Sequence, residues 1–92
     1  MINKAEPVSN QIQADILSFV NGTEHFDGLK AIRIVSKTYN LLIMTGYLSM
    51  IGEIDGRLEL VYPDGNCVSY GNVGGFYKFS HDSFEFILKE RK

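Results

Sequence analysis

Apolar and polar side chains alternate with a period of two in several short segments of this sequence. Near the C-terminus, Phe84, Phe86 and Leu88 alternate with polar residues except at Ile87, and the same spacing recurs over residues 57–62. Successive side chains of a β-strand point to opposite faces of its sheet, so the pattern predicts strands with one buried and one solvated face. We expect Ile87, the apolar residue on the solvated side, to face a partner.

Turn-forming pairs separate these segments, and each places glycine where a tight turn needs positive φ. The turns are Asn21-Gly22, Asp27-Gly28, Asp55-Gly56 and Pro63-Asp64-Gly65. No interval between residues 21 and 82 leaves room for a long helix. The predicted strands cover residues 15–20, 24–26, 29–36, 40–44, 49–54, 57–62, 67–70, 75–79 and 83–88.

So many short strands cannot lie in one open sheet without leaving an apolar face uncovered. We therefore predict an all-β fold, a β-sandwich or flattened barrel of about eight to ten short, mainly antiparallel strands. The 92 residues are too few for a second core, so residues 15–92 form a single domain. Residues 1–14 lack a clear period and are predicted to be a flexible N-terminal arm, with a short helix at residues 9–16 as the alternative.

Charge and composition narrow the classes of function. The formal net charge of −2 argues against nucleic-acid binding driven by a broad positive field. The longest apolar run, residues 41–44, is far shorter than the roughly 20 residues that span a bilayer, so we expect no direct membrane insertion. The N-terminus does not resemble an export signal, and the lone Cys67 has no internal disulfide partner. A cytoplasmic location fits these features best.

Residue types that carry catalysis are few in this chain. His25 and His81 each stand beside an acidic residue at a turn, and their spacing matches no short metal or catalytic motif. Cys67 is interpreted as a packed residue, because no basic side chain beside it would activate the thiol. The glycine-rich residues 71–75 lack the lysine and hydroxyl of a phosphate loop and are predicted to form a turn or bulge. We expect no catalytic residues, no metal and no cofactor.

Residues 41–51 carry apolar side chains at both odd and even positions, interrupted only by small polar residues, so neither face of a strand there would be fully polar. Burial on both sides would place this stretch in the centre of a sandwich. Exposure of one side would instead make a contact surface of a kind that soluble monomers seldom leave open. The sequence leaves both alternatives open.

Several short motifs follow one another in a distinctive order. They are Phe26-Asp27-Gly28 before a β-branched strand, Asp55-Gly56-Arg57-Leu58-Glu59-Leu60 before an Asp-Gly turn, Val73-Gly74-Gly75-Phe76-Tyr77-Lys78-Phe79, and the closing residues 84–90. In this order, over residues 15–90, the chain resembles the N-terminal β-sandwich domain of the epsilon subunit of F-type ATP synthases.

The resemblance implies a non-catalytic subunit of the central stalk, which bridges the gamma subunit and the c ring of a proton-translocating ATP synthase. Such a subunit reaches the membrane periphery through its complex. A family segment, G-x-L-G-I-x-P-G-H, is similar to residues 39–47. Carried over by position, the partner-binding residues are Tyr39, Asn40, Thr45, Gly46 and Tyr47. Thr45 and Tyr47 stand where the family usually has proline and histidine.

The family's C-terminal helical hairpin, which carries nucleotide sensing and inhibition of ATP hydrolysis, would begin where this chain ends at Lys92. We therefore expect both properties to be absent. The departures at Tyr39, Leu42, Thr45 and Tyr47 favour an alternative, a stand-alone or repurposed sandwich of the same kind. That protein would act as an interaction or dimerisation module, with a homodimer formed through its exposed apolar strand.

Overall fold

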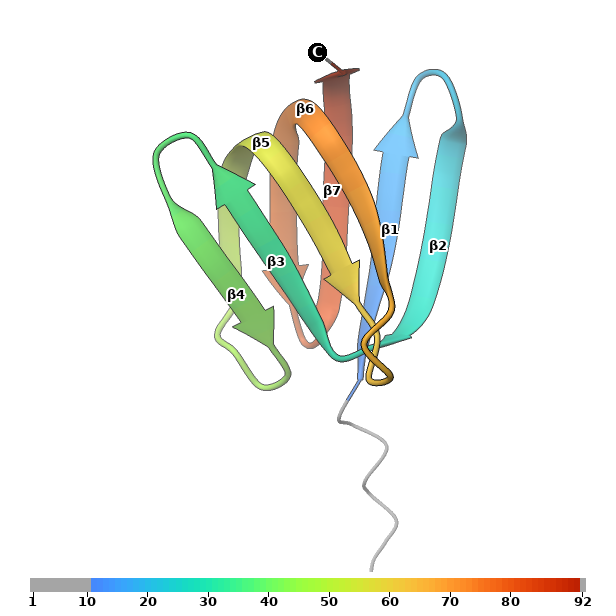
Figure 1. Cartoon of the computed structure of the whole chain (residues 1–92), viewed down its shortest axis with the longest axis vertical. Helices are drawn as coiled ribbons and strands as arrows, with labels where there is room; N and C mark the ends of the chain where they lie inside the picture. The colour runs from blue at the N-terminus through green and yellow to red at the C-terminus, as the bar shows by residue number, and fades with distance from the viewer. Residues whose placement is uncertain (1–10, 92) are drawn as a thin grey trace, which may run out of the picture.

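The computed structural model describes residues 11–91, and Figure 1 shows them as strands joined by short turns. The strands are β1 (Ile12–Ser18), β2 (Gly22–Leu29), β3 (Ala31–Ser36), β4 (Asn40–Met44), β5 (Met50–Val61), β6 (Cys67–Ser80) and β7 (Ser83–Arg91). This part of the chain contains no helix, so the prediction of an all-β fold is confirmed.

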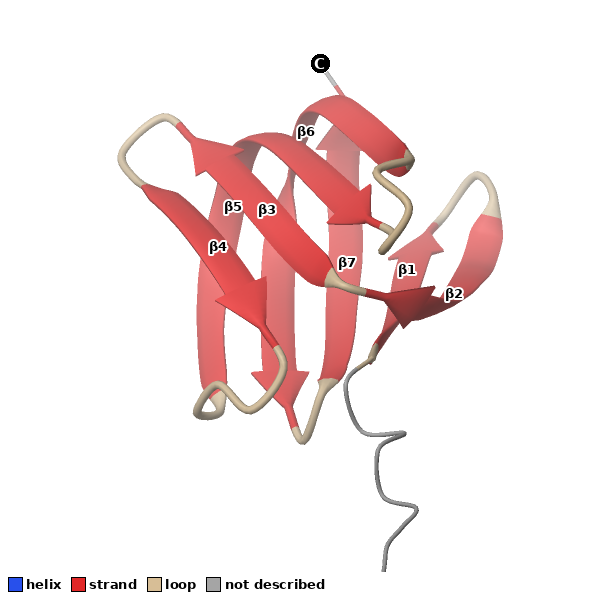
Figure 2. Ribbon diagram, turned by 60° about the horizontal axis from the view of Figure 1, so that its bottom comes forward, coloured by secondary structure: helices blue, strands red, loops and turns tan. Residues whose placement is uncertain are grey.

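All these strands belong to one sheet, in the order β2-β1-β7-β6-β5-β3-β4. Neighbours are antiparallel except β1 and β7, which are parallel. Figures 1 and 2 show that the sheet folds over into two layers, because the long strands β5 and β6 bend from one layer to the other. The front layer consists of β3, β4, residues 57–61 of β5 and residues 67–70 of β6. The back layer consists of residues 50–55 of β5, residues 73–80 of β6, β7 and β1.

The strands bend at glycines where two backbones approach closely. The register of β5 against β6 shifts at Gly56, and that of β6 against β7 shifts at Gly75. A Cβ at Gly56 would lie 2.3 Å from the carbonyl oxygen of Val35, and one at Gly75 would lie 2.0 Å from that of Ile87. Only glycine fits such contacts, and β-bulges of this kind increase the local twist and bend of a sheet.

These bulges correct the predicted number of strands. Asp55-Gly56 was expected to be a hairpin turn, but it lies inside the continuous β5, and Asp27-Gly28 lies inside β2. The predicted strands 67–70 and 75–79 are likewise one strand, β6. The described chain therefore has seven strands and not eight to ten. The prediction of a turn or bulge at residues 71–75 is confirmed by the register shift.

The start of the domain also needs correction. β1 begins at Ile12, inside the predicted arm 1–14, and Ile12 and Ala14 are fully buried. The alternative helix at residues 9–16 is wrong where the structure describes it, because residues 12–16 pair with β2 and β7 as a strand. Residues 1–10 of the predicted arm, and Lys92, lie outside the described residues.

The hydrophobic core fills the space between the layers. Leu58 of the front layer and Phe86 of the back layer are fully buried, which confirms the alternation predicted for both segments. Tyr77 and Phe84 stack with ring centroids 5.5 Å apart. The hydroxyl of Tyr70 in β6 donates to Oε1 of Glu24 in β2 at 2.6 Å, and this bond joins β6 to a strand at the edge of the sheet.

Candidate partner-binding surfaces

The five residues predicted to bind a partner lie at opposite ends of β4. Tyr39 and Asn40 lie at the β3–β4 turn, whereas Thr45, Gly46 and Tyr47 follow the other end of the strand. The strand between them is about 13 Å long, at roughly 3.3 Å per residue. The structure therefore divides the predicted site into two separate places.

Hydrogen bonds join three segments at the Thr45 end. The amide of Gly46 donates to Oδ1 of Asp82 at 2.8 Å, and the hydroxyls of Ser49 and Ser80 lie 3.3 Å apart. The amide of Gln13 donates to the carbonyl of Asp82 at 3.0 Å. The loop after β4, the β6–β7 turn and the start of β1 thus form one end of the sandwich, which we call the loop end.

The loop end displays apolar side chains to solvent. Tyr47 is 44% exposed and Leu48 is 86% exposed. Leu48 was not among the predicted binding residues, although it belongs to the apolar stretch 41–51. The sequence left open whether this stretch is buried in the core or exposed as a contact surface. The structure shows both, because Ile43 is fully buried whereas Leu48 and Ile51 are exposed.

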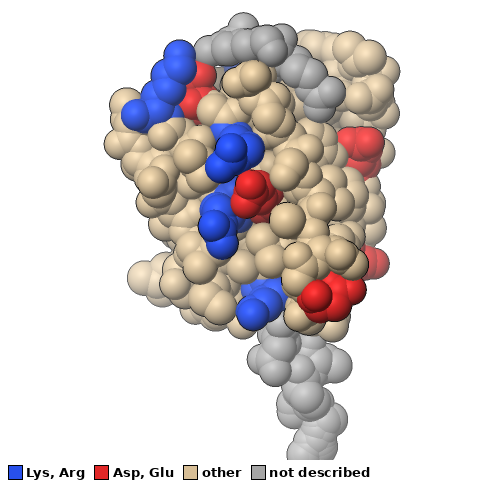
Figure 3. Space-filling model, viewed as in Figure 1, with Lys and Arg blue, Asp and Glu red and all other residues tan. Residues whose placement is uncertain are grey.

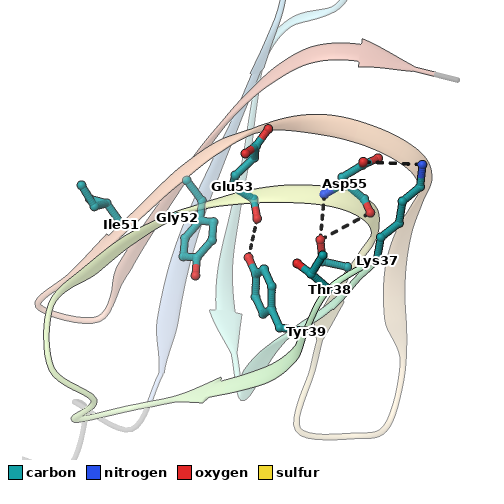
Figure 4. Close-up of a pocket in the computed structure, with 9 residues that line it drawn as sticks. Lys37, Thr38, Tyr39, Ile51, Gly52, Glu53 and Asp55 are labelled. Atoms are coloured by element: carbon teal, nitrogen blue, oxygen red, sulfur yellow. Dashed lines mark hydrogen bonds and ion pairs between the residues drawn. The ribbon is translucent and has the colours of Figure 1, made fainter.

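At the Tyr39 end, polar groups join the β3–β4 hairpin to β5 beside a pocket of about 430 Å³ (Figure 4). The hydroxyl of Tyr39 donates to the backbone carbonyl of Glu53, whose carboxylate points away from it. The hydroxyl of Ser36 accepts from the amide of Asp55 at 3.0 Å, and Nζ of Lys37 lies 3.6 Å from Oδ2 of Asp55. These contacts fix the hairpin against the back half of β5.

The protonation of Tyr39 suits this structural role. Burial raises the pKa of Tyr39, and the neighbouring Tyr77 and Glu53 raise it further. The hydroxyl therefore stays protonated at physiological pH and remains a hydrogen-bond donor. Since that hydroxyl is directed to a carbonyl of its own chain, Tyr39 acts first as a residue that positions the hairpin.

The outer surface of the back layer carries a second feature, which sequence patterns indicated only at Ile87. We call it the apolar stripe, and it consists of Leu17, Phe19, Ile51, Phe76 and Ile87. Ile87 is the strand partner of both Leu17 and Phe76, and Phe76 faces Glu53, two residues from Ile51. Ile51 is 79% exposed and Ile87 55% exposed.

Shallow grooves follow the apolar stripe. One groove of about 580 Å³ is lined by Ile51, Phe76 and Ile87, with the charged residues Glu53, Lys78 and Glu85 among its other lining residues. A second groove of about 280 Å³ is lined by Leu17, Phe19 and Ile87. Nζ of Lys89 lies 5.1 Å above the ring of Phe76. Ile87 is thus exposed on the outer face, as its predicted contact with a partner requires.

The residues considered for catalysis lie at the surface. Nδ1 of His25 is 2.5 Å from Oδ1 of Asp15, and this hydrogen bond raises the pKa of the exposed imidazole. His81 is exposed and bonded to Ser80. The interpretation of Cys67 as a packed residue is wrong, because it is exposed at the first position of β6. Within the described residues, no group of three His, Cys, Asp or Glu side chains is arranged to hold a metal ion.

Comparisons with known proteins identify the fold. No protein-family model and no curated protein matches the chain. A chain in the structure of the mitochondrial ATP synthase of Euglena gracilis, which comprises OSCP, F1 and the c-ring, superimposes with a TM-score of 0.74 at 18% identity. A chain from the central stalk and c-ring of the Tetrahymena thermophila mitochondrial ATP synthase superimposes with a TM-score of 0.63 at 12% identity.

Both superpositions cover 86% of this chain, which spans 51% of the Euglena chain and 63% of the Tetrahymena chain. At these identities the likeness establishes a shared fold. It supports the resemblance to ATP synthase stalk proteins at that level and does not single out the epsilon subunit. The described part of the chain contains no helix of the length and apolar character that crossing a membrane as a helix requires.

Proposed function

We propose that this protein is a non-catalytic, epsilon-like subunit of the central stalk of a proton-translocating ATP synthase. The observation that carries the proposal is the apolar stripe on a sandwich of this fold. Soluble monomers rarely leave a continuous apolar patch open, and such patches commonly mark protein interfaces. The fold likeness to chains of two ATP synthase assemblies adds support.

In this proposal the protein holds two partners with two surfaces. The apolar stripe binds the gamma subunit, because a stable subunit contact needs a large, partly apolar area. The loop end, with Thr45, Gly46 and Tyr47, contacts the c ring. Its loops are joined by hydrogen bonds from Gly46 and Gln13 to Asp82, which hold the loops in place relative to one another. The protein then resides at the membrane periphery through its complex.

A second candidate is a stand-alone sandwich of the same fold that binds another protein, or its own copy, through the apolar stripe. Tyr39 favours it. This residue corresponds by position to a partner-binding residue of the stalk family, yet its hydroxyl is directed to a carbonyl of its own chain.

Co-purification of the tagged full chain from its own cells tests the proposal. The expected result is recovery of gamma and c subunits. Ile87→Asp should remove the gamma subunit by placing an unpaired charge in an apolar contact, whereas Leu48→Asp at the loop end should weaken recovery of the c ring first. Each variant is the control for the other, since both replace exposed side chains. Recovery of a wholly different set of partners would overturn the stalk proposal.

A further inference from the structure

In the described residues 11–91 the sheet has two edge strands, β2 and β4, and their chemistry differs. β2 carries Glu24, His25 and Asp27, and its register against β1 contains a bulge. Charges and bulges of this kind prevent another strand from adding to an edge. β4 carries neither a charge nor a proline, and its register against β3 is unbroken from Asn40 to Met44. Of the two edges that the described residues form, β4 is therefore the one that suits strand addition.

The register determines which backbone groups of β4 face outward. The amide of Ser36 donates to Tyr39 at 2.9 Å, whereas the amide of Lys37 donates to Asp55 of β5 at 3.0 Å. Even-numbered residues of β3 thus bond to β4 and odd-numbered ones to β5, as antiparallel ladders alternate. Ile34 and Ile32 are partners of Leu41 and Ile43.

It follows that the amides and carbonyls of Asn40 and Leu42 point away from β3. At Met44 the outward carbonyl already accepts a bond of 3.3 Å from the amide of Tyr47. The free hydrogen-bonding groups are therefore concentrated around Leu42, whose side chain is 41% exposed on the outer face.

Basic side chains lie beside this edge on the outer face of the front layer, where Figure 3 shows a row of lysine and arginine residues. Arg33 is the strand partner of Leu42. Its Nε lies 3.6 Å from a carboxylate oxygen of Glu59, and Nε of Arg57 lies 3.1 Å from the other oxygen. One carboxylate shared by two guanidinium groups leaves an excess positive charge.

We propose that the free edge of β4 binds an extended, acidic segment of another protein, which adds to the sheet as a strand and places a carboxylate beside Arg33. Main-chain hydrogen bonds to Leu42 and Asn40 supply affinity, and the basic row selects acidic side chains. A second copy of this chain is a poorer occupant. Pairing of β4 with β4 would bring two basic rows onto one face, where like charges repel. This surface is independent of the stalk proposal.

The test measures binding of a short labelled peptide in which valine and glutamate alternate. The control peptide has the same length and carries lysine at each glutamate position. Leu42→Pro removes an outward amide without removing a bond to β3, a position that an edge strand tolerates. Leu42→Thr keeps the amide and is the control. We expect the glutamate peptide to bind at least about tenfold more tightly than the lysine peptide. Leu42→Pro should weaken it about tenfold, and Leu42→Thr by less than about twofold.

Two further measurements keep the proposal testable if Leu42→Pro impairs folding. Arg33→Gln should weaken binding of the glutamate peptide about fivefold and leave the lysine peptide unaffected. In NMR hydrogen exchange on the unsubstituted protein, the peptide should protect the amides of Asn40 and Leu42. Equal affinity for the two peptides, or unchanged exchange at Leu42, would overturn the proposal. A dimer in sedimentation that Leu42→Pro dissociates would assign the edge to a second copy instead.

Discussion

The outer faces of the two layers differ although their inner faces are alike. Both inner faces are apolar and largely buried, but the front layer exposes a basic row around Arg33 whereas the back layer exposes the apolar stripe around Ile87. β5 itself changes character, with Ile51 outside in its back half and Arg57 outside in its front half. The bulge at Gly56 separates these halves. A single folded-over sheet thus presents two outer surfaces of different chemistry.

The largest expected effect separates the inner from the outer side of the back layer. Phe86→Ala should lower the free energy of unfolding by about 3–5 kcal/mol, because Phe86 is fully buried and its loss leaves a cavity. Phe76→Ala, on the outer side, should cost no more than about 1 kcal/mol. Urea denaturation of both variants measures the difference. Equal losses would mean that the apolar stripe belongs to the core.

The next effect concerns the fold-over that creates the two layers. Gly75→Ala should destabilise the protein by about 1–3 kcal/mol, because its Cβ would overlap the carbonyl of Ile87 and the sheet must shift. Gly71→Ala in the same strand has no atom within 4 Å of the added Cβ and serves as the control. The thermal midpoints of the pair report the cost, and a Gly75→Ala protein as stable as the control would show that the bulge is dispensable.

A smaller effect distinguishes the two ends of β4. Tyr39→Phe removes the hydrogen bond to Glu53 and should cost about 1 kcal/mol, whereas Tyr47→Phe at the loop end should leave the unfolding free energy nearly unchanged. Binding should show the reverse order, since Tyr47 lies in the proposed c-ring contact. A loss of partner binding in Tyr39→Phe with unchanged stability would show that its role in holding the hairpin is wrong.

The smallest effect lies at the charged edge strand β2. The hydrogen bond with Asp15 raises the pKa of His25 in the folded state above its ordinary value of 6.5. Protonated His25 therefore stabilises the fold fully below about pH 6.5, and the contribution is lost as the pH rises through the raised value. Because His25 is exposed, the change should be slight. Urea midpoints across this range should show the change in the unsubstituted protein and a smaller one in Asp15→Asn, because Asp27 still lies 3.5 Å from Nε2 of His25 and also raises its pKa. Identical pH profiles for the two proteins would contradict the prediction.

Much of the fold follows from local patterns, but the layer crossing does not. Alternation at Phe84 and Phe86 identified a half-buried strand, and β4 was predicted with its observed bounds. Asp55-Gly56 was misinterpreted because a hairpin turn and a β-bulge both need glycine. Whether the chain reverses there depends on pairing with the distant Val73, which no local pattern records.

The candidate site was predicted less completely than the fold. Tyr39 and Tyr47 were assigned to one binding site because both fall in the same sequence motif. The structure separates them, because the extended strand β4 lies between the two residues. The apolar stripe joins Leu17, Ile51 and Ile87 from three strands, so the sequence indicated only the one residue that broke its own alternation. Leu48 could have been found from the apolar stretch 41–51.

Photo-crosslinking from position 87 in living cells tests the central claim most directly. A photoreactive amino acid replaces Ile87 on the apolar stripe, and the same amino acid at position 42 on the front layer is the control. We predict a crosslink from position 87 to the gamma subunit of the ATP synthase and none to that subunit from position 42. Crosslinks from position 87 only to a second copy of this chain, or to a protein outside the ATP synthase, would contradict the account.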